Sequence, residues 1–292
     1  MPQVIRARLM GFCMGVRRAV EMAMEAAEAG GRVYTLGPLI HNPQVLDSLA
    51  NLGVGVLEEE ALLGPALNQG KLRGATVLIR AHGVSPGIEA RLREAGAFIK
   101  DATCPRVKAN QIKARALSEG GCRLFLAGEK RHAEIIGIQG YAPSCRVVAD
   151  PVEAAEAAAE LFREAGGART ALLGQTTMSV EEYRAIGEEI RLKFPDLVMV
   201  DAICGASRDR QDALTELCAQ VEAVIIAGGR ESANTRRLLS IAQSLGKPAW
   251  LAESADDLID EIRAYSRVGL SAGASSPDWV IEAIERRIQC LG

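Results

Sequence analysis

The stretch RLFLAGEKRH, residues 123–132, decides the fold, because an apolar run that ends on a polar side chain recurs twice more along the chain. The other two copies are RVYTLGPLIH at 32–41 and AVIIAGGRES at 223–232. Each copy ends 28 residues after a cysteine. The cysteines are Cys13, Cys104 and Cys204, and the copies end on His41, His132 and Ser232. A repeat of this regularity predicts three equivalent units related by a pseudo-threefold axis.

A second polar side chain follows each cysteine at a longer spacing. The apolar runs TVLIRAH, TALLGQT and VGLSAGAS end 69, 72 and 71 residues after their cysteines. Their last residues are His82, Thr176 and Ser275. The repeat therefore predicts that three thiolates meet at one axis, inside a ring of six polar groups. Such an arrangement is typical of a metal-cluster site beside a polar ligand pocket.

The composition is that of a globular protein. Hydrophobic residues make up 48% of the 292 and charged residues 24%, so disorder is not expected. The formal net charge of −3 gives no sign that the whole chain binds nucleic acid or a membrane surface. No apolar run approaches a membrane span, and the N-terminal segment has no signal-peptide core. We therefore expect a cytoplasmic protein, whose cysteines bind metal, act in catalysis or fill the core.

Apolar runs alternate with helical patterns from end to end, which predicts parallel sheets covered by helices. The predicted strands are Val4–Met10, Arg32–Leu36, Thr76–Arg80, Phe98–Ile99, Arg123–Ala127, Thr170–Leu173, Leu197–Val200, Ala223–Ala227 and Gly269–Ser271. The predicted helices are Gly15–Ala29, Val45–Leu52, Gly87–Ala95, Val107–Ser118, Val180–Phe194, Arg208–Ala219, Thr235–Leu245 and Asp278–Ile288. We expect α/β units at 14–103, 104–200 and 201–292, with an N-terminal strand within 1–13 near the shared centre.

Each repeat cysteine and each of the six polar residues of the repeat follows a predicted strand and precedes a helix. Open α/β sheets bind ligands at the carboxyl ends of their strands. A helix N-terminus favours thiolate over thiol at a cysteine, and it also binds anions such as phosphate or diphosphate. The position in the repeat therefore suits both a metal centre and an anion site.

Only three cysteines occupy the repeat position, and a metal centre bound by three cysteines and no fourth limits which metal it can hold. Structural zinc has four protein ligands, and the chain contains no CxxC pair. A [4Fe–4S] cluster usually takes four cysteines, so a cluster on three keeps one open iron for a substrate. A zinc ion on three cysteines and a water is the alternative.

The remaining polar residues suit a pocket for an anion. All three histidines of the chain, His41, His82 and His132, lie at repeat positions and can donate hydrogen bonds to a diphosphate. Glu134, two residues beyond His132, is the candidate acid. Neutral donors come from Thr176, Ser232, Asn234 and Ser275, and each of these could also serve only to cap a helix.

The motifs together resemble one enzyme family. They are GFCMGV around Cys13, LIHNPQV around His41, RAHGVSP around His82, DATCPRV around Cys104, HAEIIGIQG around His132, QTTMS around Thr176, AICGASRDRQDA around Cys204, ESANTRRL around Ser232 and SAGASSPDW around Ser275. In this order they resemble the 4-hydroxy-3-methylbut-2-enyl diphosphate reductase (IspH/LytB) family of the methylerythritol-phosphate route to isoprenoids. The resemblance covers nearly the whole chain.

The resemblance implies a site and a reaction. It implies a [4Fe–4S] cluster on Cys13, Cys104 and Cys204 in a central cavity, with the substrate hydroxyl on the open iron. It implies a proton donor at Glu134 with Thr176 beside the hydroxyl. The diphosphate would lie among His41, His82, His132, Ser232, Asn234 and Ser275. Two electrons from a donor such as ferredoxin or flavodoxin, with two protons, would give isopentenyl and dimethylallyl diphosphate.

Two residues depart from the family pattern. Ala133 stands where the family commonly has proline, which loosens the loop but leaves His132 and Glu134 in place. Ala233 replaces a serine, and this puts one side-chain contact with the diphosphate in doubt.

Two other functions remain open on the residues alone. One is a [4Fe–4S] hydro-lyase, which needs no reductant, and the other is a metal-cluster sensor of a phosphorylated metabolite.

Overall fold

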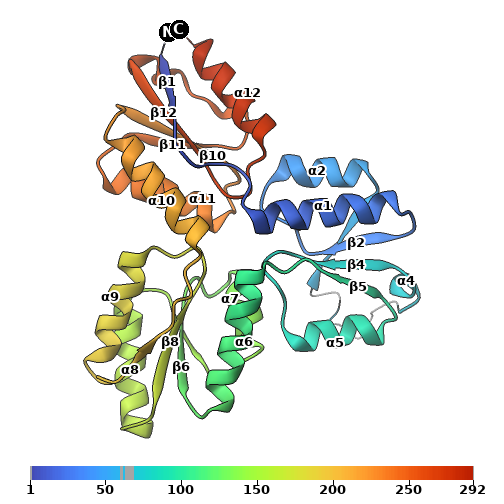
Figure 1. Ribbon diagram of the computed structural model, residues 1–292, viewed down its shortest axis with the longest axis vertical. Helices are drawn as coiled ribbons and strands as arrows, with labels where there is room; N and C mark the ends of the chain where they lie inside the picture. Colours follow the sequence, from blue (N-terminus) through green and yellow to red (C-terminus); the bar gives the residue numbers. More distant parts are fainter. Residues whose placement is uncertain (1, 60–61, 63–68, 292) are drawn as a thin grey trace. The chain divides into compact units, whose positions relative to one another are not determined.

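Three four-stranded parallel sheets form the framework of the protein. The computed structural model describes residues 2–59, 62 and 69–291, and all strand pairs in that part of the chain run parallel (Figure 1). The first sheet has strands β2 (Val33–Leu36), β3 (Val54–Leu57), β4 (Thr76–Ile79) and β5 (Phe98–Asp101). The second has β6 (Arg123–Ala127), β7 (Arg146–Val148), β8 (Thr170–Gly174) and β9 (Val198–Met199). The third has β10 (Ala223–Ala227), β11 (Ala249–Ala252), β12 (Arg267–Ala272) and β1 (Gln3–Arg6).

All three sheets have the same strand order. It is β3-β2-β4-β5 in the first sheet, β7-β6-β8-β9 in the second and β11-β10-β12-β1 in the third. The N-terminal strand β1 thus takes the place in the third sheet that β5 and β9 take in the others, at an edge beside β12. This shared order confirms the predicted fold class of three repeated α/β units with parallel sheets.

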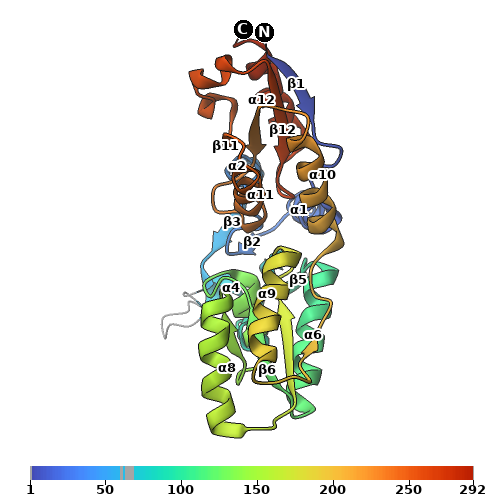
Figure 2. The same ribbon diagram turned by 90° about the vertical axis from the view of Figure 1, so that its left-hand side faces the viewer.

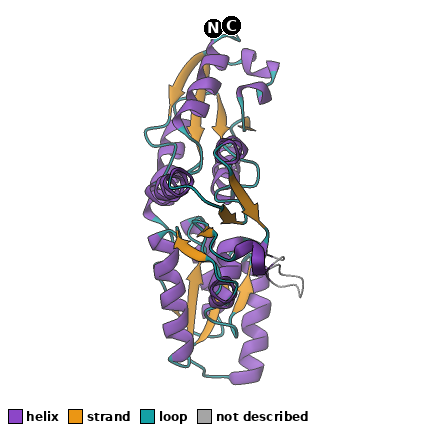
Figure 3. Cartoon of the chain, turned by 90° about the vertical axis from the view of Figure 1, so that its right-hand side faces the viewer, coloured by secondary structure: helices purple, strands orange, loops and turns teal. Residues whose placement is uncertain are grey.

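The helices fill the connections between strands, and Figure 3 shows them in purple around the orange strands. The α-helices are α1 (Met14–Glu28), α2 (Pro43–Asn51), α4 (Gln69–Leu72), α5 (Pro86–Glu94), α6 (Pro105–Glu119), α7 (Ala133–Gln139), α8 (Pro151–Ala165), α9 (Val180–Arg191), α10 (Gly205–Cys218), α11 (Ala233–Ser244) and α12 (Asp278–Gln289). Two 3₁₀ turns, η1 (Ala255–Asp257) and η2 (Asp260–Ala264), follow β11.

The second sheet shows why these strands are apolar throughout. Alternate residues of β6 face opposite sides, as the pleat requires. Phe125 packs with Ile186 and Ile190 of α9, whereas Leu124 and Leu126 pack with α6 and α7. Figures 1 and 2 show α8 and α9 along one face of this sheet, and Figure 1 shows α6 and α7 on the other. Helices on both faces bury every residue of β6 except Arg123 at its start.

The chain divides into two compact units. The first consists of Met1–Val20, Ile40–Leu52 and Gly205–Gly292 and contains the third sheet. The second consists of Glu21–Leu39 and Gly53–Cys204 and contains the first and second sheets. The predicted boundaries at 14–103, 104–200 and 201–292 stay a prediction, and so does a central cavity. Within the described ranges, every helix is too short or too polar to cross a lipid bilayer.

Candidate functional site

The three repeat cysteines occupy one position in the topology. Each follows the strand that lies fourth in its sheet, β1, β5 or β9, and each directly precedes a helix, α1, α6 or α10. Their side chains are half-buried. The backbone N–H of Val16 lies 3.5 Å from the Sγ of Cys13 and donates to it. The first turn of α1 thus faces this sulfur, and its N–H groups would stabilise a negative charge there.

The backbone N–H of each cysteine ties its loop to the neighbouring strand end. The N–H of Cys104 donates to the carbonyl of Ala81, beside His82, at 2.9 Å. The N–H of Cys204 donates to the carbonyl of Thr176 at 2.9 Å. The equivalent bond of Cys13 reaches the carbonyl of Ala274, beside Ser275, at 3.1 Å. In each sheet, therefore, the cysteine is held next to the second polar residue of a repeat.

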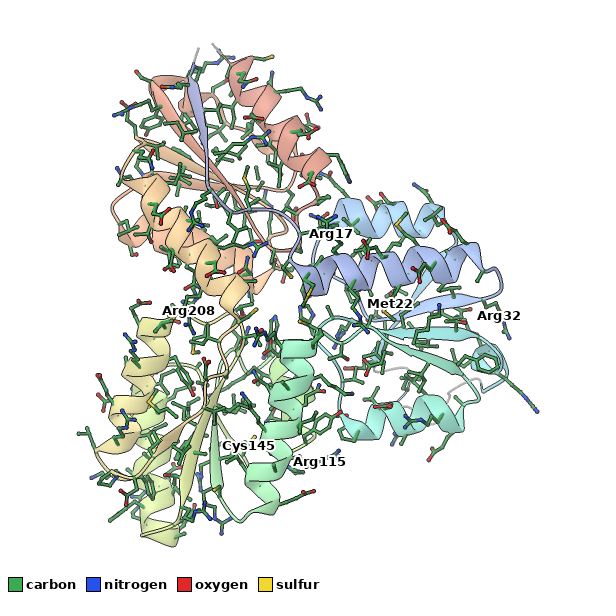
Figure 4. The ribbon with its side chains drawn as sticks, viewed as in Figure 1. Arg17, Met22, Arg32, Arg115, Cys145 and Arg208 are labelled. Carbon is green, nitrogen blue, oxygen red and sulfur yellow. The ribbon has the colours of Figure 1, made fainter. Side chains whose placement is uncertain are left out.

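The other four cysteines, Cys122, Cys145, Cys218 and Cys290, have different environments. Burial raises the pKa of the Cys145 thiol to about 11, so this residue (Figure 4) stays a thiol at neutral pH. Cys218 is buried in the core, and its pKa is also raised by burial. Cys122 is only half-buried, because it lies in the turn before β6 and not within the sheet. Cys290 is exposed.

Glu134 is a buried carboxyl group whose two oxygens both bind Thr176. The backbone N–H of Thr176 donates to Oε1 at 2.8 Å, and the Thr176 hydroxyl lies 2.7 Å from Oε2. Glu134 is 1% exposed, and this burial raises its pKa from 4.5 to about 7 although the Thr176 hydrogen bonds lower it. The group therefore titrates at physiological pH, which a proton donor needs.

His132 caps the helix that carries Glu134. Its Nδ1 accepts the backbone N–H of Glu134 at 3.2 Å, and α7 starts at the next residue, Ala133. Since Nδ1 accepts, the hydrogen of the neutral ring lies on Nε2. The ring of His82 lies edge-on to it, with centroids 5.0 Å apart. The alanine at 133 thus leaves His132 and Glu134 on one helix start.

Gln175 is a further buried residue of this loop, and the sequence analysis does not predict it. Its Oε1 accepts the N–H of Glu129 at 2.9 Å, and its Nε2 donates to the hydroxyl of Thr177 at 3.0 Å. The side chain therefore fixes the loop before α7 to the end of β8. Its place beside Thr176 was the available signal.

The predicted serines of the third sheet lie together. Ser232 is the N-cap of α11, where its Oγ accepts the N–H of Thr235, and the hydroxyl of Ser275 donates to it at 3.5 Å. Asn234 is 5% exposed, and neither of its side-chain polar atoms has a hydrogen-bond partner within the described residues. A buried amide without partners is costly, so it indicates a group that binds there.

His41 lies between β2 and the N-cap of α2, which is Asn42. Its carbonyl approaches Gly229 so closely that a Cβ at that position would overlap it. Only glycine fits there. The loop that carries His41 therefore lies against the loop before Ser232.

The predicted site residues are divided between the two compact units. The second unit carries Cys104, Cys204, His82, His132, Glu134 and Thr176, and the first carries Cys13, His41, Ser232, Asn234 and Ser275. Contacts within a unit join Glu134 to Thr176, Thr176 to Cys204, and Ser232 to Ser275. That all of them meet at one axis stays a prediction.

Known proteins resemble this chain over its whole length. The family described as LytB protein matches residues 4–289. The 4-hydroxy-3-methylbut-2-enyl diphosphate reductase of Treponema denticola is 40% identical over 290 residues, which cover 98% of each chain. The enzyme of the same name from Aquifex aeolicus is 40% identical over 291 residues, 99% of this chain and 96% of its own.

Two solved structures share the fold. One is a structure of (E)-4-hydroxy-3-methyl-but-2-enyl diphosphate reductase, described as the terminal enzyme of the non-mevalonate pathway; it is 39% identical with a TM-score of 0.68 and 99% coverage of both chains. The other, the reductase from Plasmodium falciparum, has a TM-score of 0.88 at 24% identity and covers 98% of this chain and 87% of its own. With a match that runs from the first strand to the last helix, the chain belongs to the LytB protein family.

Proposed function

We propose that this protein is a 4-hydroxy-3-methylbut-2-enyl diphosphate reductase, the last enzyme of the methylerythritol-phosphate route to isoprenoids. The reaction breaks the allylic C–O bond of the substrate and releases the oxygen as water. Two electrons come from an external donor, one proton goes to the leaving oxygen and one to the allyl carbon skeleton. The products are isopentenyl diphosphate and dimethylallyl diphosphate. Relatives of this name at 40% identity over the full length support the assignment.

The observation that carries the proposal is the buried pair of Glu134 and Thr176. A hydroxyl leaves readily only when it is protonated as it departs, and a carboxyl group with a pKa of about 7 holds a proton at neutral pH. A binding protein that only senses a metabolite has no use for such an acid. This favours an enzyme over the sensor.

The geometry also indicates which oxygen carries the proton. Oε1 of Glu134 accepts the backbone N–H of Thr176, so the acidic hydrogen belongs on Oε2. Oε2 faces the Thr176 hydroxyl at 2.7 Å. When Glu134 is protonated, that hydroxyl accepts from Oε2 and turns its own hydrogen toward a third group. We infer that this third group is the substrate oxygen, so that Thr176 passes the proton on.

The diphosphate would bind to donors at the helix starts. His132 offers its Nε2–H, since Nδ1 is occupied by the Glu134 backbone. The amide of Asn234 and the hydroxyls of Ser232 and Ser275 offer neutral donors. We propose His41 and His82 as further donors to the same anion. Anchoring this unreactive end uses binding energy to orient the hydroxyl for reaction.

The repeat cysteines fit an iron–sulfur cluster. Family members use an iron–sulfur cluster, and we propose that Cys13, Cys104 and Cys204 hold a [4Fe–4S] cluster with one open iron. All three are half-buried and directly precede helices, and the Val16 N–H points at the Cys13 sulfur. When bound, the cluster would supply electrons and a Lewis acid for the substrate oxygen.

The reaction needs an electron donor, for which we propose a ferredoxin or a flavodoxin. A reducing cytoplasm would keep the cysteines available as ligands.

The proposal is tested on protein purified without oxygen. We expect brown protein that contains iron and sulfide and that releases water from the substrate only when a reductant is supplied. Turnover without reductant would favour the hydro-lyase. Colourless protein that contains zinc, or iron-loaded protein that binds the substrate without turnover, would refute the proposed reaction.

A further inference from the structure

Two buried side chains hold the loops that carry two of the repeat cysteines. Asn110 and Arg210 lie six residues after Cys104 and Cys204, so they are equivalent positions on α6 and α10. The Nδ2 of Asn110 donates to the carbonyl of Ala202 at 3.1 Å. The Nη2 of Arg210 donates to the carbonyl of Gly11 at 2.8 Å. Each bond joins groups within one compact unit.

The two carbonyls are also equivalent positions. Ala202 lies two residues before Cys204, and Gly11 lies two residues before Cys13. The helix that starts at one cysteine therefore binds the loop of the next cysteine in the repeat. The same geometry at two places in an internal repeat indicates a shared role, since a chance contact has no reason to recur.

Burial makes both bonds hard to replace by water. Asn110 is 2% exposed and Arg210 is 3% exposed. The Arg210 guanidinium also donates from Nη1 to the carbonyl of Ala206 at 2.7 Å, so it joins the first turn of α10 (Arg208 in Figure 4 marks this turn) to the Gly11 loop. A buried carbonyl that loses its donor carries a desolvation penalty, so the loop would have to move.

The loop of Cys104 is held in a different way. The residue six positions after Cys13 is Ala19, which has no donor. Instead, the Asp101 carboxylate accepts the N–H of Thr103 at 3.0 Å and pairs with Lys108 at 3.0 Å. Each cysteine loop thus has a side chain that fixes its backbone.

We infer that Asn110 and Arg210 are positioning residues that fix the backbone of the Cys204 and Cys13 loops and so hold these thiolates ready for a cluster. The inference rests on the proposed function, because it concerns the same cysteines. Partners that orient metal ligands change metal binding by 10- to 100-fold when they are lost, as a general expectation.

The test measures how firmly the cluster is held in protein reconstituted with iron and sulfide. The variants Asn110→Leu and Arg210→Met remove the hydrogen-bond donors. The variant Arg210→Lys keeps a charged donor group at this position. Lys113→Met is the matched control, since Lys113 lies on the same helix as Asn110 and donates to the neighbouring carbonyl, Asp201, from an exposed position. The readouts are the rate of iron loss to a chelator without oxygen, the cluster spectrum, and the melting temperature of the cluster-free chain.

We expect Asn110→Leu and Arg210→Met to lose iron roughly ten times faster than the wild type or more, at a temperature where all variants are folded. Lys113→Met should match the wild type, and Arg210→Lys should lie between. Iron loss at the wild-type rate in both donor-free variants, or an equal acceleration in Lys113→Met, overturns the inference. If Asn110→Leu does not fold, Asn110→Ser, which is too short to reach Ala202, is judged by the same criterion. A wild-type chain that takes up no iron would refute the proposed function instead.

Discussion

At the scale of single residues, Glu134 has the properties of a general acid. It is buried, its carboxyl oxygens are fixed by Thr176, and its pKa is about 7. An acid of this kind works in its protonated form, and the protonated fraction falls as the pH rises through the pKa. A diphosphate bound in the proposed site would raise the pKa of Glu134 further, because like charges disfavour the carboxylate.

We predict that Glu134→Gln lowers turnover by roughly 10²-fold or more, because the amide keeps the shape of the side chain but has no transferable proton. In the wild type, turnover should fall on the alkaline side with an apparent pKa of 7 or above, and the variant should lack this limb. The measurement is turnover against pH with a strong artificial reductant, so that electron supply does not limit the rate.

Glu181→Gln serves as the control, since Glu181 is an exposed carboxylate at the start of α9. It should keep the wild-type rate and pH profile. Wild-type turnover in Glu134→Gln would remove this residue from the mechanism.

The sequence predicts Glu134 because it is the only carboxylate within two residues of a repeat histidine. Asn110 and Arg210 are not predictable in this way. Polar residues on a helix usually face solvent, and only the packing of a distant loop against α6 or α10 buries these two. Their partners are backbone carbonyls, which leave no trace in the sequence.

At the scale of elements, the turn between β4 and α5 depends on Gly83. Its φ of +70° lies in the left-handed region, and a Cβ there would overlap the amide of Gln111 and come within 3.0 Å of Cγ2 of Thr103. Thr103 directly precedes Cys104. Glycine is therefore required by the backbone conformation and by the close approach of the cysteine loop.

We predict that Gly83→Ala lowers the free energy of unfolding by about 3 kcal/mol, the sum of a strained φ and an overpacked contact. Gly121→Ala should cost only about 1 kcal/mol, because Gly121 has a φ of +76° but no atom within 4 Å of its Cβ position. Urea unfolding of both variants measures the difference. If both variants lose the same free energy of unfolding, the close contact between Gly83 and the cysteine loop contributes nothing to stability.

The predicted elements are right where the apolar signal is strong. Strands β6 and β10 have the predicted bounds, whereas β1 ends at Arg6 and not at Met10. The edge strands β3, β7 and β11 are absent from the sequence prediction, because strands of three or four half-buried residues carry little periodicity. The helix α8 is also absent from it, although Asp150 and Pro151 form a standard helix start. The sequence therefore contains a local signal for the start of α8.

At the scale of the whole molecule, the repeat in the sequence corresponds to a repeat in topology. In the strand order given above, each sheet places a cysteine after its fourth strand and two polar residues after its second and third strands. The spacing of the cysteines predicts this correspondence, because equal spacing along a repeated fold gives equal positions. Whether the three sheets meet at a common centre depends on contacts that no local pattern encodes.

We predict that Cys13→Ala, Cys104→Ala and Cys204→Ala each lose most of the bound iron, since three ligands are the minimum for the proposed cluster. Cys145→Ala and Cys290→Ser should keep it, because these thiols lie outside the repeat. The iron and sulfide content of each variant after anaerobic reconstitution shows which cysteines hold the cluster. In a cluster-loaded crystal structure the three sulfurs should lie within about 8 Å of each other, and a larger separation would contradict a shared cluster.

The pairing of β1 with β12 has a consequence for biosynthesis. The ribosome makes β1 first and β12 nearly last, so the edge strand that leads to Cys13 has no sheet to join until almost the whole chain has emerged. The first and second sheets contain only consecutive strands and can form earlier. The loop of Cys13 is therefore synthesised first and completed last, and we expect the proposed cluster to be inserted only when synthesis of the chain is nearly finished.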